Sequence, residues 1–499
     1  MSEEYESIIL KTGWGLFTYF IISLCGFCTM AEAGASLIIL LVAPLLACDL
    51  NYHKDDIMTM NATSSLGMAF GGLLFGVLID TLGRRETFSV TMIVIFCGTM
   101  GLSFAQSFFL INLAVFVIGI GVAGNNAVIR IYIIEFLPSR KRGSCLAVID
   151  FLWIVGYLTS LGMLWGLIPS VIKMQEQEWR PSSWRVLVGL GAVPALLGSC
   201  AISLLPSSPR YLLYRRQPER ALAVLRQIYA INFSKHADKF EVSNIEGCIQ
   251  PDDDDDDESE EIQTLKKIVC KCFLKNRQRV QKIFTLPYLR ISLLSIVACC
   301  LQFPGFIWLA LWNMKVLNDT QNLNEFSLLM NNNTCISNSG SVAMTFFNTC
   351  HQENNEHLQT FSLLSLSFTL SELFLIFAVD KFGRRLFLIS SGLIGSMAMI
   401  TFTFVTSHVI RIVLSVAILS AFAVSYTTVT LFLLENYPTA LRGTIIGFAR
   451  ILPHLVGFFM KSFMKLPCLM TLYIASGIMI GTVITTLPIP DLTNAPLQE

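Results

Sequence analysis

The chain has 499 residues, of which 54% are hydrophobic and only 14% are charged, and its formal net charge is +0. A soluble globular protein carries about 25% charged residues, so this composition excludes an ordinary soluble domain. The balanced charge argues against a nucleic-acid partner. Apolar runs of about 20 residues, long enough to cross a bilayer, recur along the sequence. The sequence therefore predicts an integral multi-pass membrane protein surrounded by lipid bilayer.

Twelve apolar segments are predicted to span the membrane, each as a helix, because lipid offers no partner for backbone amides. The segments are 14–47, 61–80, 86–105, 109–134, 144–168, 184–205, 291–313, 359–380, 386–407, 411–434, 443–463 and 467–487. This pattern predicts an all-α membrane protein of two pseudosymmetric six-helix halves. The predicted parts are an N-terminus 1–13, a first bundle 14–205, a central loop 206–290, a second bundle 291–487 and a C-terminus 488–499.

Two unlike motifs recur at one shared offset, which indicates an internal duplication. One motif follows the second span and the other follows the fourth, and each copy stands 300 residues later. The motif residues and their copies are Asp80, Gly83, Arg84, Arg85, Glu135 and Arg142, then Asp380, Gly383, Arg384, Arg385, Glu435 and Arg442. One six-span unit therefore stands twice in the chain.

Basic residues such as Arg84, Arg140 and Arg384 fall in loops of one parity, together with the central loop. Because Lys and Arg favour the cytoplasmic side of a membrane, this side is predicted to be cytoplasmic, with both termini on it. The segment Met1 to Thr12 has no basic region of the kind that opens a removable signal peptide. The pattern does not separate the plasma membrane from an intracellular vesicle membrane.

The central loop is predicted to contain a short surface helix over Gln217–Tyr229, where apolar residues recur at helical spacing. Further on, Asp252 to Asp257 form an unbroken acidic run. Self-repulsion keeps such a run extended, so it is interpreted as a solvated linker. A calcium-binding or partner-binding role is the alternative, although the run lacks the glycine turn of a calcium loop.

The loop 314–358 is predicted on the non-cytoplasmic side. It holds two glycosylation sequons, at Asn318 and Asn332. It also holds Cys335 and Cys350, which an oxidising compartment would pair as a disulfide. Two free thiols are the alternative.

The repeated motifs around Asp80 and Glu135 resemble those of the major facilitator superfamily, and Pro206–Arg210 resembles the motif after the sixth helix in its sugar- and organic-ion-transporter branch. The stretches Tyr132–Pro138 and Glu435–Arg442 resemble synaptic vesicle glycoprotein 2 and its related proteins. The resemblance covers all twelve spans. It implies alternating-access transport, with the motif residues as a cytoplasmic gate.

The sequence departs from this family at several points. Thr81 and Lys381 stand where the family often has Arg, and the basic residue of the fourth helix is Arg130, deeper than the family's. The hexose-carrier signature of the seventh helix is absent, and Leu301–Trp308 stands in its place. These departures argue against an ordinary sugar carrier.

Elementary chemistry gives the motif residues a gating role. Asp80 is expected to accept hydrogen bonds from backbone N–H groups at a neighbouring helix N-terminus. Arg84 and Arg85 are expected to pair with Glu135 or with lipid phosphates. Contacts of this kind form in one state and break in the other. The alternative for the basic residues is that topology alone places them on the cytoplasmic side.

Five ionisable residues lie inside the predicted spans, where each costs about 2.5–3.5 kcal/mol and should face the protein interior. Asp150 and Arg450 are 300 residues apart and are assigned to the gate region. Glu32 and Glu372 are candidate coupling carboxyl groups. The alternative for both is a structural ion pair with Arg130, Arg450 or a group on another helix.

Polar and aromatic residues in the spans are candidates for a solute cavity with a few polar tips. They are Asn125, Asn126, Trp153, Tyr157, Trp308, Trp312, Tyr426 and His454. For the aromatic residues the alternative is ordinary packing or anchoring at the membrane interface. For His454 packing and proton relay both stay open.

The sequence shows no nucleotide loop, nucleophile elbow or metal-ligand pair, so no enzyme activity, cofactor or metal is predicted. The preferred hypothesis is a transporter that moves a small organic solute, an organic ion or related metabolite, by alternating access. It would be facilitative or coupled to H+ or Na+. The alternative is a vesicle-membrane glycoprotein with a binding or trafficking role and little transport.

Overall fold

The structure is a computed structural model that describes residues 2–50, 54–172, 183–240, 242, 245, 277–286, 288–301, 355–405, 407–459 and 468–497. Within these ranges the regular elements are helices, and no strand occurs. Several predicted features lie outside the described residues: the acidic run, Trp308, Trp312, Asn318, Asn332, Cys335 and Cys350.

Six long helices form the first half. They are α2 (Leu16–Leu50), α3 (Lys54–Thr81), α4 (Arg84–Phe104), α5 (Phe108–Ile134), α6 (Arg142–Ile172) and α7 (Ser183–Ile202). Local sequence sets several of their ends. Ser107 caps α5 by accepting a hydrogen bond from the backbone N–H of Leu110, and Gly83 opens α4 at a φ of 108°, a conformation that glycine adopts without strain.

The described helices of the second half correspond to those of the first. They are Leu289–Leu301, α14 (Asn355–Phe382), α15 (Arg384–Phe402), α16 (His408–Glu435), α17 (Arg442–Phe458) and α19 (Cys468–Thr486). Gly383 opens α15 at a φ of 86°, as Gly83 does for α4. Across the described residues, eight helices are long and apolar enough to cross a membrane. The predicted fold class is confirmed, and each predicted span contains a described helix.

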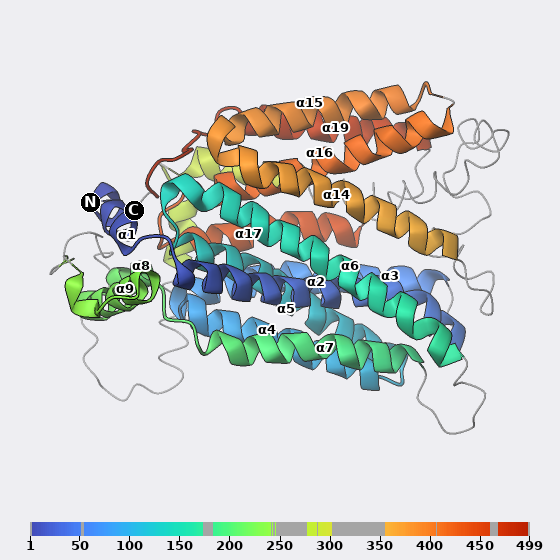
Figure 1. Ribbon diagram of the computed structural model, residues 1–499. Helices are drawn as coiled ribbons and strands as arrows, with labels where there is room; N and C mark the ends of the chain where they lie inside the picture. Colours follow the sequence, from blue (N-terminus) through green and yellow to red (C-terminus); the bar gives the residue numbers. More distant parts are fainter. Residues whose placement is uncertain are drawn as a thin grey trace.

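The two halves meet along two seams. We call the contact of α3 with α17 the α3/α17 seam, and the contact of α6 with α14 the α6/α14 seam (Figure 1). Each seam therefore pairs one helix from the first half with one from the second. Gly72 and Gly76 of α3 lie in the first of these seams, against Gly447 of α17.

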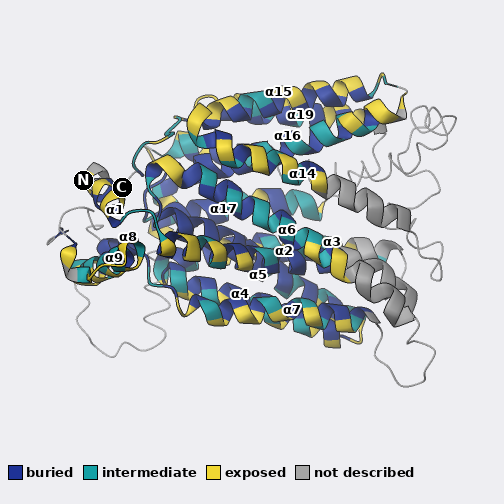
Figure 2. Ribbon diagram, viewed as in Figure 1, coloured by how far each residue is buried: buried dark blue, intermediate teal, exposed yellow. Residues whose placement is uncertain are grey.

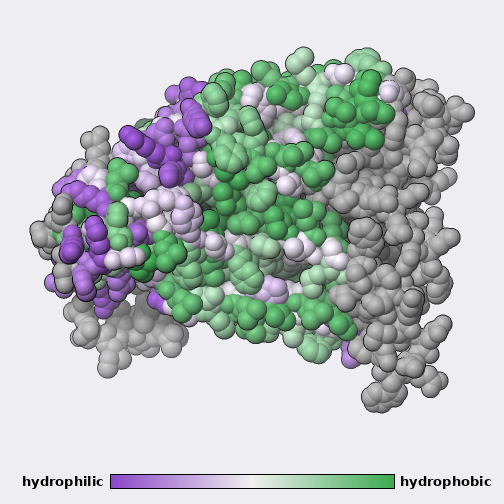
Figure 3. Space-filling view, viewed as in Figure 1, coloured by the Kyte–Doolittle hydropathy of each residue, from purple (hydrophilic) through white to green (hydrophobic). Residues whose placement is uncertain are grey.

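The sides of the bundle carry an apolar coat. Phe374, Phe377 and Met397 are 62%, 67% and 67% exposed, as are other large apolar side chains of several helices. Exposed residues lie along the outer faces of these helices (Figure 2). The hydropathy surface shows the same coat as a broad green region over the helices (Figure 3). Exposed apolar surface of this extent suits lipid and not water.

One end of the bundle, which we call the polar end, carries α1 (Ser2–Thr12), α8 (Pro209–Tyr214) and α9 (Pro218–Phe233), and both chain termini lie there (Figure 1). Polar residues gather on this end in Figure 3. The predicted surface helix of the central loop is confirmed as α9. Asn232 joins α9 to the start of α2, because its Oδ1 accepts a hydrogen bond of 3.0 Å from the Phe17 backbone N–H.

Candidate functional site

Arg84 is the first residue of α4, at the polar end, and it is 1% exposed. Its Nε donates to Glu135 Oε1 at 3.0 Å, and its Nη2 donates to the Thr439 carbonyl at 2.7 Å. Thr439 belongs to the second half, so one side chain links the two halves. Asp80 lies 3.7 Å from the same guanidinium group. A buried cation is tolerable here because carboxylates and carbonyls surround it.

The carboxylate of Asp80 accepts hydrogen bonds from the start of α17. The backbone N–H groups of Gly443 and Thr444 donate to it at 3.3 and 2.8 Å, and the Thr444 hydroxyl donates at 2.8 Å. The first amides of a helix lack intrahelical partners and carry partial positive charge, which a carboxylate satisfies. The contact expected for Asp80 is therefore present, and its helix is α17 of the other half.

The duplicated residues form the same arrangement on the α6/α14 seam. Asp380 accepts from the backbone N–H groups of Gly143 and Ser144, at the start of α6, at 3.1 and 2.8 Å. Arg384 Nη2 lies 2.8 Å from Glu435 and 3.0 Å from Asp380. We call these two sets, named after their seams, the α3/α17 cluster and the α6/α14 cluster. Each cluster ties a carboxylate of one half to a helix of the other.

The motif arginines Arg142 and Arg442 differ in their partners. Arg442 approaches Glu135 at 3.6 Å across the halves. Its counterpart Arg142 instead binds Glu6 of α1 at 2.7 Å and donates to the Ala495 carbonyl at 3.2 Å. Glu6 also accepts a hydrogen bond from the Ser139 backbone N–H. The segments near both chain ends therefore meet at one buried guanidinium group.

Of the two partners expected for Arg85, Glu135 or a lipid phosphate, the structure shows Glu135 bound to Arg84 instead. Arg85 Nη2 donates to the Ser203 carbonyl at 2.6 Å, just beyond the end of α7. Arg385 does the same in the second half, donating to the Ile489 carbonyl at 2.9 Å. Consecutive residues on a helix point about 100° apart, so only one arginine of each pair can face the cluster.

Each half has a buried tyrosine near the polar end. Tyr211 of α8 lies beneath the Arg84 guanidinium, 4.5 Å from its ring centre, and its hydroxyl donates to the Thr81 carbonyl at 3.1 Å. Burial raises the pKa of the Tyr211 phenol. Burial likewise raises the pKa of Tyr437 to about 12, and that phenol donates to Ser292 at 2.9 Å. Both groups therefore stay neutral donors at physiological pH.

Inside the bundle, Glu32 of α2 is 1% exposed and faces two amides of α5. Asn125 Nδ2 donates to one carboxyl oxygen at 2.9 Å, and Asn126 Nδ2 donates to the other at 3.2 Å. Two N–H donors satisfy the carboxylate form of the side chain. The two asparagines thus hold Glu32, and α5 is helical at both positions.

The polar contacts continue from α5 into the second half. Arg130 forms an ion pair with Asp150 and also donates to the Asn126 carbonyl at 2.9 Å. The Thr427 hydroxyl lies 2.9 Å from Asp150 and 3.0 Å from Glu372. We call this set, from Glu32 through Asn125, Asn126, Arg130, Asp150 and Thr427 to Glu372, the central polar chain. It places Asp150 with the buried polar groups and not with the gate clusters.

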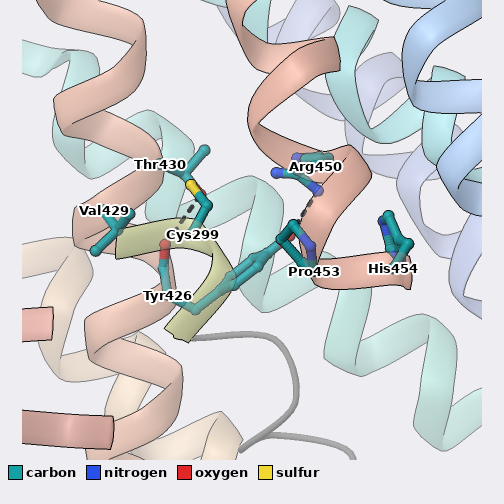
Figure 4. Close-up of a pocket in the computed structure, with 7 residues that line it drawn as sticks. All are labelled: Cys299, Tyr426, Val429, Thr430, Arg450, Pro453 and His454. Atoms are coloured by element: carbon teal, nitrogen blue, oxygen red, sulfur yellow. Dashed lines mark hydrogen bonds between the residues drawn. The ribbon is translucent and has the colours of Figure 1, made fainter. Parts of the chain in front are cut away.

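Arg450 lines a small cavity of about 20 Å³ in the second half (Figure 4). Its Nη1 donates to the Tyr426 hydroxyl at 2.9 Å. The lining residues are Cys299, Tyr426, Val429, Thr430, Arg450, Pro453 and His454. A volume of this size holds about one water molecule. The structure therefore places Arg450, Tyr426 and His454 together in the lining of this cavity.

Trp153 and Tyr157 lie on α6 with their ring centres 6.3 Å apart, in a tilted arrangement. They do not line the cavity of Figure 4. Tyr426 lies nearer to the charged groups, since the guanidinium carbons of Arg130 and Arg450 are 6.0 and 5.6 Å from its ring centre. Among the described residues, the predicted aromatic residues therefore do not line one common cavity, since Tyr426 lines it and Trp153 and Tyr157 do not.

Three residues at these sites were not singled out by the sequence. Thr427 lies in the hydroxyl-rich run Ser425–Thr430 of an apolar span, and that run is the signal that could have found it, whereas Thr439 is a single threonine in a loop. Glu6 stood out only as one of several acidic residues before the first span. The counterpart of Arg142 in the second half is Arg442, which lies against Glu135. The duplication alone therefore did not predict Glu6 as the partner of Arg142.

Comparison with known proteins agrees with this geometry. The sequence pattern described as "Sugar (and other) transporter" matches residues 50–306. Synaptic vesicle glycoprotein 2A of Rattus norvegicus is 27% identical over 265 residues, covering 52% of this chain and 36% of that protein. Synaptic vesicle glycoprotein 2B of Mus musculus is 27% identical over 259 residues, covering 51% of this chain and 38% of that protein. This chain thus matches little more than a third of the length of these relatives.

Two solved structures share the fold. The proton:xylose symporter XylE bound to 6-bromo-6-deoxy-D-glucose has a TM-score of 0.68 at 16% identity, covering 96% of this chain and 97% of that one. The inward-open xylose transporter XylE from E. coli has a TM-score of 0.57 at 16% identity, covering 95% of this chain and 97% of that one. The predicted resemblance is confirmed, since the chain has the major facilitator fold and the family pattern covers just over half of its length. The chain belongs to the sugar (and other) transporter family.

Proposed function

We propose that the chain moves a small organic solute across a membrane by alternating access of its two halves. One observation carries the proposal: Asp80 and Asp380 each bind the first amides of a helix in the opposite half, at the same end of the bundle. Opening that end requires both contacts to break. Contacts of this kind, present in one state and absent in the other, make a gate.

The gate residues would work on the cytoplasmic side. The polar end carries the arginines that favour this side, together with both termini. In the present arrangement the polar end is held closed, so solute would enter from the opposite side. The central polar chain supplies buried ionisable groups, and these suit coupling to H+ or Na+ as well as contact with a polar solute. XylE, which shares the fold, is a proton symporter of xylose.

An uptake experiment tests the proposal. Cells that express the chain and control cells would be compared for untargeted solute uptake at two pH values, and the solute found would then be followed in proteoliposomes. Asp80→Asn should lower uptake at least about tenfold, the factor that corresponds to losing about 1.4 kcal/mol of a charge-assisted contact. Asp491→Asn is a matched control, since Asp491 makes its hydrogen bonds within the second half. Equal uptake by wild type and Asp80→Asn would remove the gate assignment.

A second candidate function follows from the relatives, which are synaptic vesicle glycoproteins by name. In this alternative the chain acts in a vesicle membrane as a binding or trafficking component. Capture of a stable protein partner from vesicle membranes, with no solute flux in the same membranes, would favour it. Tags beside Arg84 and Arg384 test the shared premise, because both must report the same side of the membrane.

A further inference from the structure

Three buried carboxyl groups of the central polar chain have different partners. Glu32 accepts from two amides, and Asp150 is ion-paired with Arg130. Glu372 is 2% exposed, yet its Oε2 has no hydrogen-bond partner within the described part of the chain. A carboxylate in that position would be a buried charge without a cation of its own, which is costly.

The hydroxyl of Thr427 decides which carboxyl group holds a hydrogen. Its oxygen lies 2.9 Å from Asp150 Oδ2 and 3.0 Å from Glu372 Oε1. A hydroxyl group has one hydrogen to donate and otherwise accepts. Asp150 is the ionised partner because Arg130 binds it, so it takes the Thr427 hydrogen. The contact with Glu372 is then a hydrogen bond only if Glu372 supplies the hydrogen.

We propose that Glu372 is a proton-binding site of this protein, held neutral at the seam between the halves by Thr427 and Asp150. The charged and titratable groups around it agree with this. Asp150 of α6 already has Arg130 of α5 as its ion-pair partner, and Glu32 of α2 accepts hydrogen bonds from two amides. On α16 the Tyr426 phenol faces Arg450 of α17. The charged residues of α15, Arg384 and Arg385, lie in its first turn, at the polar end.

Release of the proton would act on the α6/α14 seam. The Glu372 O–H bond breaks, the proton passes to water, and a second carboxylate remains beside the Thr427 hydroxyl. Two carboxylates that share one site resist being ionised together. Because Asp150 belongs to the first half and Glu372 to the second, their repulsion pushes the halves apart at this depth. This coupling role rests on the proposed transport function, whereas the presence of the proton does not.

Infrared difference spectroscopy of the full chain in lipid vesicles tests the site without any solute. The wild type should show the C=O stretch of a protonated carboxylic acid at neutral pH, and the band should disappear as pH is raised. Glu372→Gln should lose this band. Glu32→Gln is the matched control, a buried carboxyl group expected to be ionised, and should keep it. Asp150→Asn should move the disappearance of the band to lower pH, because the like charge is removed.

Several results would overturn the assignment: no acid band in the wild type, a band that persists in Glu372→Gln, or a band that is lost in Glu32→Gln. If Glu372→Gln does not fold, isotopically labelled glutamate in the wild type replaces it, and a band that fails to shift would rule out a glutamate. A band that appears only when sodium is replaced by a bulky organic cation would assign the site to Na+ instead. Vesicles with the band but no solute flux would refute transport and leave the proton site standing.

Discussion

The α3/α17 seam and the α6/α14 seam are related by the duplication, yet different residues build them. In the first, helix backbones touch: a Cβ on Gly447 would lie 2.3 Å from the Gly72 carbonyl oxygen, and one on Gly76 would lie 2.8 Å from Gly447 Cα. In the second, the positions that match Gly72 and Gly447 are Glu372 and Ala147. One copy has thus kept close backbone packing, and the other carries an ionisable group.

This difference indicates that the two seams of a pseudosymmetric gate can have different roles. Both seams keep the same carboxylate-to-helix contact at the polar end, through Asp80 and Asp380. Farther from that end, the α3/α17 seam has glycines. Its packing therefore depends on the volume of the side chains there and not on pH. The α6/α14 seam has the Thr427 contact, which depends on a proton. The four predictions below test this division.

The largest effect is expected from Arg84→Gln. The change removes the ion-pair partner of the buried Asp80 and leaves Glu135 with Arg442 alone, at a cost of about 3–5 kcal/mol. Arg384→Gln is the mirror variant, and its loss should be smaller because Arg384 binds Glu435 and Asp380 of its own half whereas Arg84 also reaches Thr439. Thermal unfolding of the purified chains measures both. A larger drop for Arg384→Gln would show that the cross-half bond of Arg84 contributes little.

Gly447→Ala should come next, with a loss of about 3 kcal/mol from overpacking against backbone that has no room to move. Gly477→Ala is a matched control, because a Cβ there meets nothing within 4 Å. That control should be neutral or slightly stabilising, since Ala is the better helix former. The two unfolding temperatures are compared. Equal behaviour would mean that the α3/α17 seam is not closely packed.

Asp80→Asn should cost about 1.5 kcal/mol, and Asp380→Asn somewhat less, because Asp80 accepts three hydrogen bonds and Asp380 accepts two. The buried thiol of Cys145, on α6, reports opening of its seam. Its rate of alkylation, followed by mass spectrometry of the labelled peptide, should rise more in Asp380→Asn than in Asp80→Asn. The reverse order would mean that the two clusters do not act locally.

The smallest effect is expected from Glu6→Gln, at about 1 kcal/mol. It weakens the contact between α1 and Arg142, while Tyr5, Ile8 and Ile9 still pack on α8 and α9. Limited proteolysis should cut within α1 faster in the variant than in the wild type. Glu4→Gln is the control, because Glu4 is an exposed acid of the same helix. Equal cutting of both variants would show that Arg142 does not hold α1.

Much of the fold and of the gate could be predicted because the spans and motifs occur twice in the sequence. The apolar spans and the two repeated motifs predicted the helices, the halves and the contact of Asp80 with a helix start. The partner of Arg85 could not be predicted, since residue spacing alone does not say which side of a turn faces the neighbouring helix. The Thr427 contact depends on where α16 meets α6, a tertiary relation between residues 277 positions apart in sequence. Glu6 illustrates the same limit, because α1 packs on α8 and α9, which lie about 200 residues later in the sequence.

Tyr426 gives the molecule a natural optical probe. Guanidinium groups approach its ring from both halves, Arg130 from the first and Arg450 from the second. Any sliding of one bundle on the other changes the electric field at the ring. An indole installed there, as Tyr426→Trp, would turn that field change into a shift of its emission wavelength.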